Sequence, residues 1–343
     1  MGRTDRQNMR PFYVATRRFR GLAILLCALL VPGLLVTRVR GAEPDFASWL
    51  AGLRQEALAE GISPTTFDSA MAGVEPVPSV LASDRNQPEF KLNLETYLKR
   101  VVSDGRVAAG KERAKALRPM LSEISARYGV QPRFLVALWG IESDYGRVLG
   151  NRPIIPALAT LAYDPRRAKF FRGELLHVLH VLEERLANPA DLRGSWAGAI
   201  GGLQFMPSVY RRFAVDYDHD GRVDIWHDSG DLLASGGAYL AGEGWSRGKG
   251  WGCEVKLTKA IPAQVLGHDH LASLARWRKR GVQLPVGLEL PRPSTAASLL
   301  IPDPLSGRAF LVYDNYRVLL KWNHSDLFAL AVGLLADRLA LGV

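Results

Sequence analysis

The sequence predicts an α+β protein that is mainly helical, and three observations support this fold class. Apolar residues recur at helical spacing over most of residues 45–241. Short strand-like stretches follow among Gly and Pro residues between positions 251 and 315, and an apolar helical run closes the chain. About 300 residues remain after the N-terminal leader, which is enough to bury a sizeable core in more than one lobe.

Residues 1–42 have the pattern of an export signal. Six Arg residues precede an apolar run, Leu22 to Val36, that is too short for a comfortable membrane span. Cleavage after Gly41 or Ala42 would follow small residues, so we expect a periplasmic protein that has lost this signal peptide. A retained N-terminal anchor is the alternative, and the residues before Cys27 do not fit a lipoprotein signal.

The positive charge of the chain is concentrated in this leader. The whole sequence has 44 Lys and Arg against 34 Asp and Glu, and residues 1–42 hold eight Arg and a single acid, Asp5. The mature chain therefore has 36 basic against 33 acidic residues, a balance that does not support nucleic-acid binding. It also keeps one cysteine, Cys253, and so cannot form an internal disulfide.

The expected elements follow from local patterns. Pro119 should kink or restart its helix, and Gly146 supplies a stop for the helix that begins near Phe134. Helices are expected over residues 45–72, 92–102, 109–128, 134–146 and 327–341, with a further helix that follows Arg167 and ends near Asn188. Strands are expected over Val255–Leu257, Ser298–Ile301, Phe310–Val312 and Arg317–Trp322.

The stretch from Phe134 to Gly146 holds a candidate catalytic residue. Apolar residues such as Leu138 and Ile141 recur at helical spacing, and Glu142 lies beside them in the last turn. A carboxyl desolvated in this way has its ionised form disfavoured and its pKa raised, as a general acid near neutral pH requires. An ordinary surface contact at a helix end is an equally compatible interpretation of this stretch.

Two further polar features are candidates for ligand binding. Arg166 and Arg167 precede a helix, and paired Arg residues can hold a carboxylate, although such pairs more often form a solvated face. Gln204 is the bulky polar residue in Gly194–Ser208, a segment rich in Gly and Ala that permits close backbone approach. A buried Gln must be hydrogen-bonded, either to backbone or to a bound sugar amide.

An acidic loop predicts a calcium site. Asp216, Asp218 and Asp220 match positions 1, 3 and 5 of an EF-hand loop. Gly221 matches the tight turn at position 6, and Arg222 would offer its carbonyl at position 7.

The end of this loop departs from the EF-hand pattern. Position 12 is His227 rather than Glu, so a longer loop could close through Asp228 or Asp231. Clustered carboxylates repel one another unless a cation is present, which favours calcium over the alternative of an empty acidic turn.

Together these residues resemble the membrane-bound lytic transglycosylase B family, glycoside hydrolase family 103, over nearly all of the mature chain. The motifs that carry the resemblance are Trp139–Gly146, Pro165–Arg167, Ser195–Ser208, the loop 216–231 and Trp322–Ser325. The family has a lysozyme-like helical core. This implies a helical N-terminal lobe (43–110), a catalytic core with the EF-hand-like loop (111–250), a small β-containing lobe (251–315), and a C-terminal strand and helix (316–343) completing the core.

The resemblance implies a lytic transglycosylase, which cleaves the β-1,4 bond between N-acetylmuramic acid and N-acetylglucosamine in peptidoglycan without net hydrolysis. It implies Glu142 as the single acid/base. The other implied residues are Ser195, Gln204, Tyr239 and Asn323 along the sugar cleft, Arg166 and Arg167 near the peptide stem, and Asp231 as the late carboxylate of the calcium loop. Peptidoglycan glycan strands are the implied partner, and other cell-wall enzymes are further candidates. We expect a monomer without an organic cofactor.

Two positions depart from the family, because Trp322 and Phe328 stand where some relatives carry Tyr. Without the two Tyr hydroxyls, hydrogen bonding at that end of the cleft is in doubt, whereas the aromatic rings still offer a stacking surface. One acid is sufficient if the N-acetyl oxygen of the substrate stabilises the developing cation and the muramoyl 6-hydroxyl replaces water. A hydrolytic muramidase would need a second carboxylate, and a non-catalytic peptidoglycan-binding protein would not need Glu142.

Overall fold

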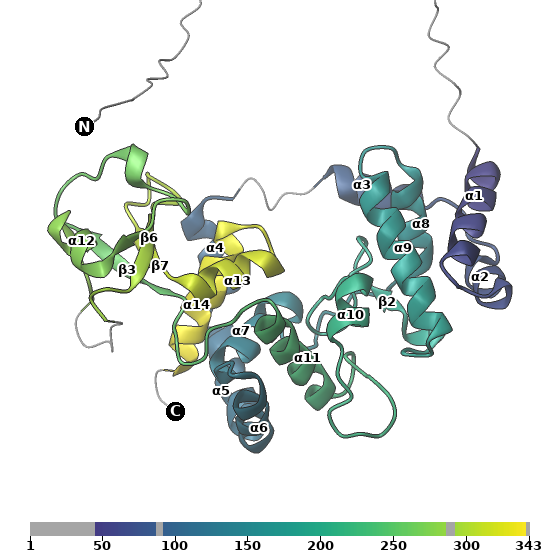
Figure 1. Cartoon of the computed structure of the whole chain (residues 1–343), viewed down its shortest axis with the longest axis horizontal. Helices are drawn as coiled ribbons and strands as arrows, with labels where there is room; N and C mark the ends of the chain where they lie inside the picture. Colours follow the sequence, from purple (N-terminus) through teal and green to yellow (C-terminus); the bar gives the residue numbers. More distant parts are fainter. Residues whose placement is uncertain (1–44, 87–91, 286–291, 341–343) are drawn as a thin grey trace, which may run out of the picture. The chain divides into compact units, whose positions relative to one another are not determined.

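The computed structural model describes residues 45–86, 92–285 and 292–340, so the predicted signal peptide lies outside the described residues. The described residues are mainly helical, with a small β-sheet region towards the C-terminus, as the sequence predicts (Figure 1). None of the helices in this part of the chain combines the length and the apolar character of a membrane span.

The N-terminal region consists of short helices with clear start signals. α1 (Phe46–Ala59) is capped by Asp45, and α2 (Pro64–Met71) is capped by Ser63. The single helix predicted over residues 45–72 is therefore interrupted, because Gly61 adopts a left-handed φ of 91°. α3 (Pro78–Arg85) and α4 (Leu94–Val101) follow.

The helices of the central region pack around α7 (Pro132–Ser143). α7 contacts α5 (Asp104–Ala116), α6 (Arg118–Tyr128), α11 (Ser229–Gly242) and α14 (Asp326–Ala340). The restart predicted at Pro119 is confirmed, since α5 ends and α6 begins just before it. The remaining helices here are α8 (Ile154–Tyr163), α9 (Ala168–Glu183), which ends earlier than predicted, and α10 (Pro207–Phe213).

Two sheets complete the fold. β1 (Arg152–Pro153) pairs antiparallel with β2 (Arg193–Gly194). The larger sheet is antiparallel with the order β4-β6-β7-β3-β5. Its strands are β3 (Gly252–Leu257), β4 (Ala272–Ser273), β5 (Val282–Gln283), β6 (Ala296–Leu300) and β7 (Ala309–Val312). With α12 (Leu274–Lys279) it forms a second hydrophobic core around Trp277, in which Cys253 is a buried free thiol.

The strand predicted over Arg317–Trp322 is wrong, because these residues form the end of helix α13 (Asp314–Trp322). Asn315, Val318 and Leu319 are buried on one face of this helix at the i, i+3, i+4 spacing. A window of six residues was too short to distinguish this helical period from a strand. The consequence for the site is that Trp322 projects from the last turn of a helix.

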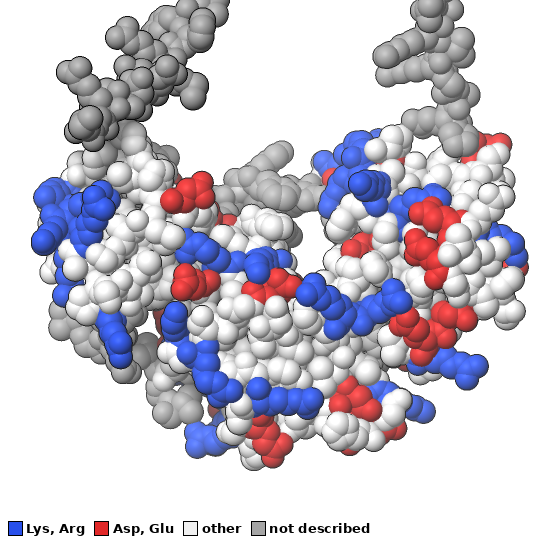
Figure 2. All heavy atoms as spheres, viewed as in Figure 1, with Lys and Arg blue, Asp and Glu red and all other residues white. Residues whose placement is uncertain are grey.

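Acidic and basic side chains alternate over much of the visible face, and Lys and Arg gather over the region of α12 (Figure 2). The mixed distribution matches the near-neutral balance of residues 43–343, which have 36 Lys and Arg against 33 Asp and Glu.

Candidate active site

α7 places Glu142 at the border of the main core. Every residue from Phe134 to Gly140 is buried, whereas Glu142 in the last turn is half-buried. The helix stops at Asp144, which adopts a left-handed φ of 53° and caps α7 with its backbone N–H.

The turn after Glu142 is fixed by two close contacts. Tyr145 also has a left-handed φ, 60°, and its hydroxyl donates a hydrogen bond to the carbonyl of Arg106 at 2.8 Å. The ring then lies against Gly140, where an added Cβ would come 2.6 Å from the Tyr145 hydroxyl oxygen. Gly140 is therefore required for this turn to fold back onto its own helix.

Ser143 joins the end of α7 to the Gly-rich segment. Its buried hydroxyl donates to the carbonyl of Gly202 at 2.6 Å and accepts from the N–H of Gly146 at 3.0 Å. This pair of bonds holds the neighbour of Glu142 against a segment 59 residues further along the chain.

Trp322 contacts the candidate acid directly. Its indole Nε1–H donates a hydrogen bond to Oε1 of Glu142 at 2.8 Å. The ring packs on Tyr239, with centroids 4.8 Å apart, and on Phe205 at 5.3 Å. The indole N–H of Trp322 therefore supplies a hydrogen bond where some relatives have a Tyr hydroxyl. The aromatic surface at this end of the cleft is also kept.

Glu142 opens into a cavity of about 310 Å³. Asn323 and Phe328 share its lining, and Phe328 is itself almost fully buried. The described residues of its lining are Leu92, Tyr97, Arg100, Val101, Arg106, Ile141, Glu142, Asn323 and Phe328. Among these described residues Glu142 is the one carboxylate.

Asp144 is a poor candidate for the acid despite its position two residues from Glu142. It forms an ion pair with Arg147 at 2.7 Å and lies 3.4 Å from Arg106. The hydrogen bond from Arg147 and the positive charge of both guanidinium groups hold the pKa of Asp144 below its usual value. Asp144 is therefore ionised at neutral pH and carries no proton to transfer.

Gln204 and Ser195 lie beside the loop that follows Glu142. Gln204 has a left-handed φ of 49°, and its amide nitrogen donates to the carbonyls of Leu149 at 3.1 Å and Gly201 at 2.9 Å. The Ser195 hydroxyl accepts hydrogen bonds from the N–H groups of Ala197 and Ala199. The backbone alternative considered for Gln204 thus accounts for both of its N–H groups, and its carbonyl oxygen is the atom that can meet a ligand.

Tyr239 reaches the same region from α11. It is 7 % exposed, and burial, with a smaller contribution from the negative charge of Glu243, raises its pKa to about 12. The hydroxyl therefore stays protonated at any physiological pH and can donate a hydrogen bond. Its edge-to-face contact with Trp322, whose indole N–H binds Glu142, connects it to the candidate acid.

Arg166 and Arg167 line a different cavity and are not in contact with Glu142. Arg166 pairs with Asp84 and with Asp164, the latter at 3.2 Å. Arg167 lies 3.6 Å from Asp84 and stacks over Phe170 and Phe171. Each side chain remains about half exposed (47 % and 49 %), so both can still reach a ligand, but acidic neighbours offset part of their charge.

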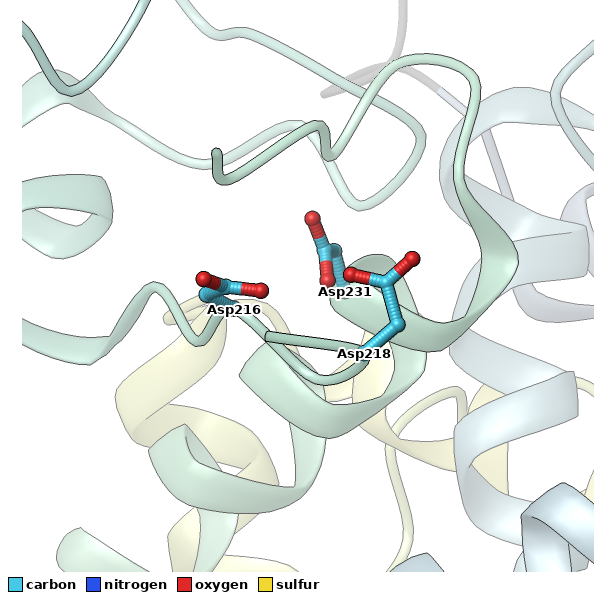
Figure 3. Close-up of side chains that lie close together, drawn as sticks. All are labelled: Asp216, Asp218 and Asp231. Carbon is cyan, nitrogen blue, oxygen red and sulfur yellow. The ribbon is translucent and has the colours of Figure 1, made fainter. Parts of the chain in front are cut away.

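The acidic loop brings three predicted calcium ligands together. Asp216, Asp218 and Asp231 each offer a carboxylate oxygen, and these atoms lie within 4.8 Å of one another (Figure 3). Asp231 comes from the first turn of α11 and is 2 % exposed, and this burial raises its pKa. Asp228 instead caps α11 by accepting the N–H groups of Gly230 and Asp231, so of the two late carboxylates it is Asp231 that lies with Asp216 and Asp218.

The remaining predicted ligands are outside this group. Asp220 accepts the N–H of Arg222, and both residues are exposed. The group nevertheless fits a cation, because Oδ1 of Asp216 is buried and has no hydrogen-bond partner among the described residues. A buried carboxylate oxygen that accepts no hydrogen bond needs a proton or a cation as its partner. Calcium, which prefers oxygen ligands, could be that cation.

Three residues that α4 and α5 contribute to the cavity were not predicted from the sequence. Tyr97, Arg100 and Arg106 line it together with Glu142. Tyr97 and Arg100 are three residues apart on one face of α4, opposite the buried Leu98, and this pattern identifies a polar face. Nothing local in the sequence indicates that this face lines a cavity with Glu142, which lies more than 40 residues further along the chain.

Comparison with known proteins identifies relatives. The profile of the family described as "Transglycosylase SLT domain" matches residues 45–337. The membrane-bound lytic murein transglycosylase B of Escherichia coli K12 is 35% identical over 218 residues. That match covers 62% of this chain and 58% of the E. coli protein.

Solved structures of relatives have the same fold. SltB3 of Pseudomonas aeruginosa, solved in complex with NAG-anhNAM-pentapeptide, is 44% identical with a TM-score of 0.81, covering 86% of this chain and 79% of that one. Slt35 of Escherichia coli, a lytic transglycosylase solved in complex with calcium, is 29% identical with a TM-score of 0.72, covering 88% and 94%.

Proposed function

This chain belongs to the transglycosylase SLT family, and on that premise we propose that it is a lytic transglycosylase acting on peptidoglycan, with Glu142 as the single acid/base. The observation that most supports this role is the cavity at Glu142, whose described lining contains no other carboxylate. Glycosidases that hydrolyse their substrate usually need two carboxylates. An enzyme with one can take its nucleophile from the substrate itself.

The chemistry balances with one acid. Protonated Glu142 gives its proton to the glycosidic oxygen, and the bond between that oxygen and C1 of the muramoyl residue breaks. The N-acetyl oxygen of the same sugar stabilises the cation at C1. The muramoyl 6-hydroxyl then attacks C1 and returns its proton to the Glu142 carboxylate, giving a 1,6-anhydro ring with no water consumed.

Intramolecular capture competes well with water. Effective molarities of well-oriented groups reach about 10⁵–10⁸ M, against about 55 M for water. Gln204, with its carbonyl oxygen free of the two backbone bonds, and Ser195 are suited to bind the N-acetyl region of the sugar. Asn323 and the aromatic surface of Tyr239 and Trp322 would hold the glycan at Glu142, and Arg166 and Arg167 would meet the peptide stem.

The chemical structure of the reaction products tests the proposed function. Digestion of purified cell-wall sacculi should yield muropeptides with 1,6-anhydromuramoyl ends, which resist borohydride reduction and are lighter than hydrolysed ends by one water. Separation and mass analysis before and after reduction measure this directly. Reducible ends that carry oxygen from labelled water would instead identify a hydrolytic muramidase, and no products at all would favour a binding protein.

We also propose that Asp216, Asp218 and Asp231 hold a structural calcium ion, supported by the buried oxygen of Asp216 and by the relative solved with calcium. When bound, calcium would neutralise the mutual repulsion of the carboxylates. Asp231 accepts the N–H groups of Tyr217 and Asp224 as well, so the ion would tie α11 to the loop and contribute stability, not chemistry.

Added calcium should raise the melting temperature. A ligand that binds only the native state contributes about 2.7 kcal/mol at a concentration 100 times its Kd. Differential scanning calorimetry in the presence of calcium and in the presence of a chelator measures the shift in melting temperature. Asp231→Asn should lose the calcium response, whereas Asp228→Asn, which changes a cap in the same loop, should keep it. Identical melting curves of the wild type in both conditions would contradict the calcium site.

The localisation rests on residues outside the described structure. We propose export to the periplasm with removal of the leader after Gly41 or Ala42, on the basis of the leader pattern in the sequence. N-terminal sequencing should find Ala42 or Glu43 first, whereas an intact N-terminus in the membrane fraction would indicate a retained anchor.

A further inference from the structure

The cavity at Glu142 contains two arginines whose surroundings differ. The guanidinium of Arg106 already interacts with other groups of the protein. Its Nη1 donates to the carbonyl of Val101 at 2.7 Å, its Nε lies 3.4 Å from Asp144, and its side chain is 17 % exposed. It therefore acts as a structural brace between α4 and the turn after Glu142.

Arg100 lines the same cavity from the last turn of α4, and its side chain is exposed. Within the described ranges its guanidinium forms no hydrogen bond and no ion pair. Arg166 and Arg167 differ in this respect, since Asp84 and Asp164 partly neutralise them. Arg100 thus presents a planar cation with five N–H donors to the cavity that holds the candidate acid.

The substrate of the proposed reaction carries a complementary group. Muramic acid bears a lactyl ether on the same ring as the scissile C1–O bond, and this ends in a carboxylate when the stem peptide is absent. When the peptide is present, the lactyl group is amide-linked and the carboxylates belong to the peptide. In naked glycan the carboxylate is therefore on the reacting ring itself, whereas in peptide-bearing glycan it lies further out along the stem peptide.

We propose that Arg100 is a substrate-specificity residue that binds a carboxylate of the muramoyl residue, either lactyl or stem-peptide, in the cavity beside Glu142. This inference rests on the proposed function, because it needs a muramoyl residue at Glu142. A guanidinium binds carboxylate in a bidentate manner and holds it at a fixed angle. Arg100 would therefore bind the reacting sugar by its acidic substituent and orient its C1–O bond towards Glu142.

Steady-state kinetics of Arg100→Gln test the inference on matched substrates. Naked glycan strands and peptide-bearing strands are each compared with the same material after conversion of its carboxylates to methyl amides. Lys99→Gln is the matched control, since Lys99 precedes Arg100 on α4 but lines a separate cavity with Glu95 and Arg308. Both variants remove one exposed positive charge from the same helix.

Arg100→Gln should raise KM about 10- to 100-fold on carboxylate-bearing glycan with little change in kcat, the effect of one lost hydrogen-bonded charge pair. It should have no effect on the methyl amides, and Lys99→Gln should match the wild type throughout. A loss confined to naked glycan identifies the lactyl carboxylate, and a loss confined to peptide-bearing glycan identifies the stem peptide.

Three outcomes would overturn the inference. These are no loss on any substrate, an equal loss on the methyl amides, and a shifted pH–rate profile on all substrates, which would mean that Arg100 acts on Glu142 instead of on the substrate. The wild type separates this inference from the proposed function. If the wild type yields no anhydro products, the proposed function itself is refuted. If the wild type yields them and Arg100→Gln is unaffected, only the role of Arg100 is refuted.

Discussion

Glu142→Gln should leave a folded protein with almost no lytic activity. Gln is nearly isosteric and can still accept the Trp322 indole N–H through its carbonyl oxygen, so the packing at the end of α7 is preserved. The transferable proton is lost, and general acid–base catalysis alone contributes about 10²–10⁴-fold. Release of soluble muropeptides from sacculi measures activity, and circular dichroism with thermal melting verifies the fold.

Asp144→Asn is the matched control for this substitution, because it neutralises a carboxylate two residues away that is already held in ion pairs. It should keep most of the activity. If a well-folded Glu142→Gln retains more than about a tenth of wild-type activity, the wrong carboxylate has been assigned. A larger loss in Asp144→Asn than in Glu142→Gln would point to Asp144 instead.

Much of the helical fold is predictable because its information is local. The helical spacing of apolar residues around Leu121 and Ile124, with Pro119 as a restart signal, predicts α6 correctly. Short elements carry too few periods for this reasoning. The six residues Arg317–Trp322 were read as a strand, and the partners that stabilise the helix, such as Ser246 and Lys249 bound by Asn315, lie more than 60 residues away in sequence.

The candidate site likewise has a part that local sequence predicts and a part that it does not. The calcium loop is contiguous, so its spacing predicts Asp216 and Asp218, which the structure brings together with Asp231, one of the two late carboxylates that the spacing left open. The surroundings of Glu142 come from distant segments. Its indole partner lies 180 residues further along the chain, and the arginines of its cavity come from α4 and α5. The sequence identifies such groups only by resemblance to a family, and here it gave no indication of Arg100.

Trp322→Phe should lower kcat about 10- to 100-fold while KM changes little. Phe keeps an aromatic ring against Tyr239 and Phe205 but removes the N–H that donates to Oε1 of Glu142 at 2.8 Å. Hydrogen bonds to charged groups contribute about 1.5–3 kcal/mol, and without this one the carboxylate can rotate away from the scissile bond. Because an N–H donor favours the ionised carboxylate, the alkaline limb of the pH–rate profile should also move to higher pH. Steady-state kinetics across pH measure both effects.

Two variants make this result specific. Trp322→Tyr restores a donor of the kind that some family members carry, and it should recover part of the lost kcat. Trp245→Phe removes an indole hydrogen bond of similar length, the 3.1 Å bond to Gln131, from a buried site away from Glu142. It should lower the melting temperature and leave the pH–rate profile unchanged. If Trp322→Phe behaves like Trp245→Phe, with reduced stability and an unaltered profile, Trp322 is a packing residue and does not orient the acid.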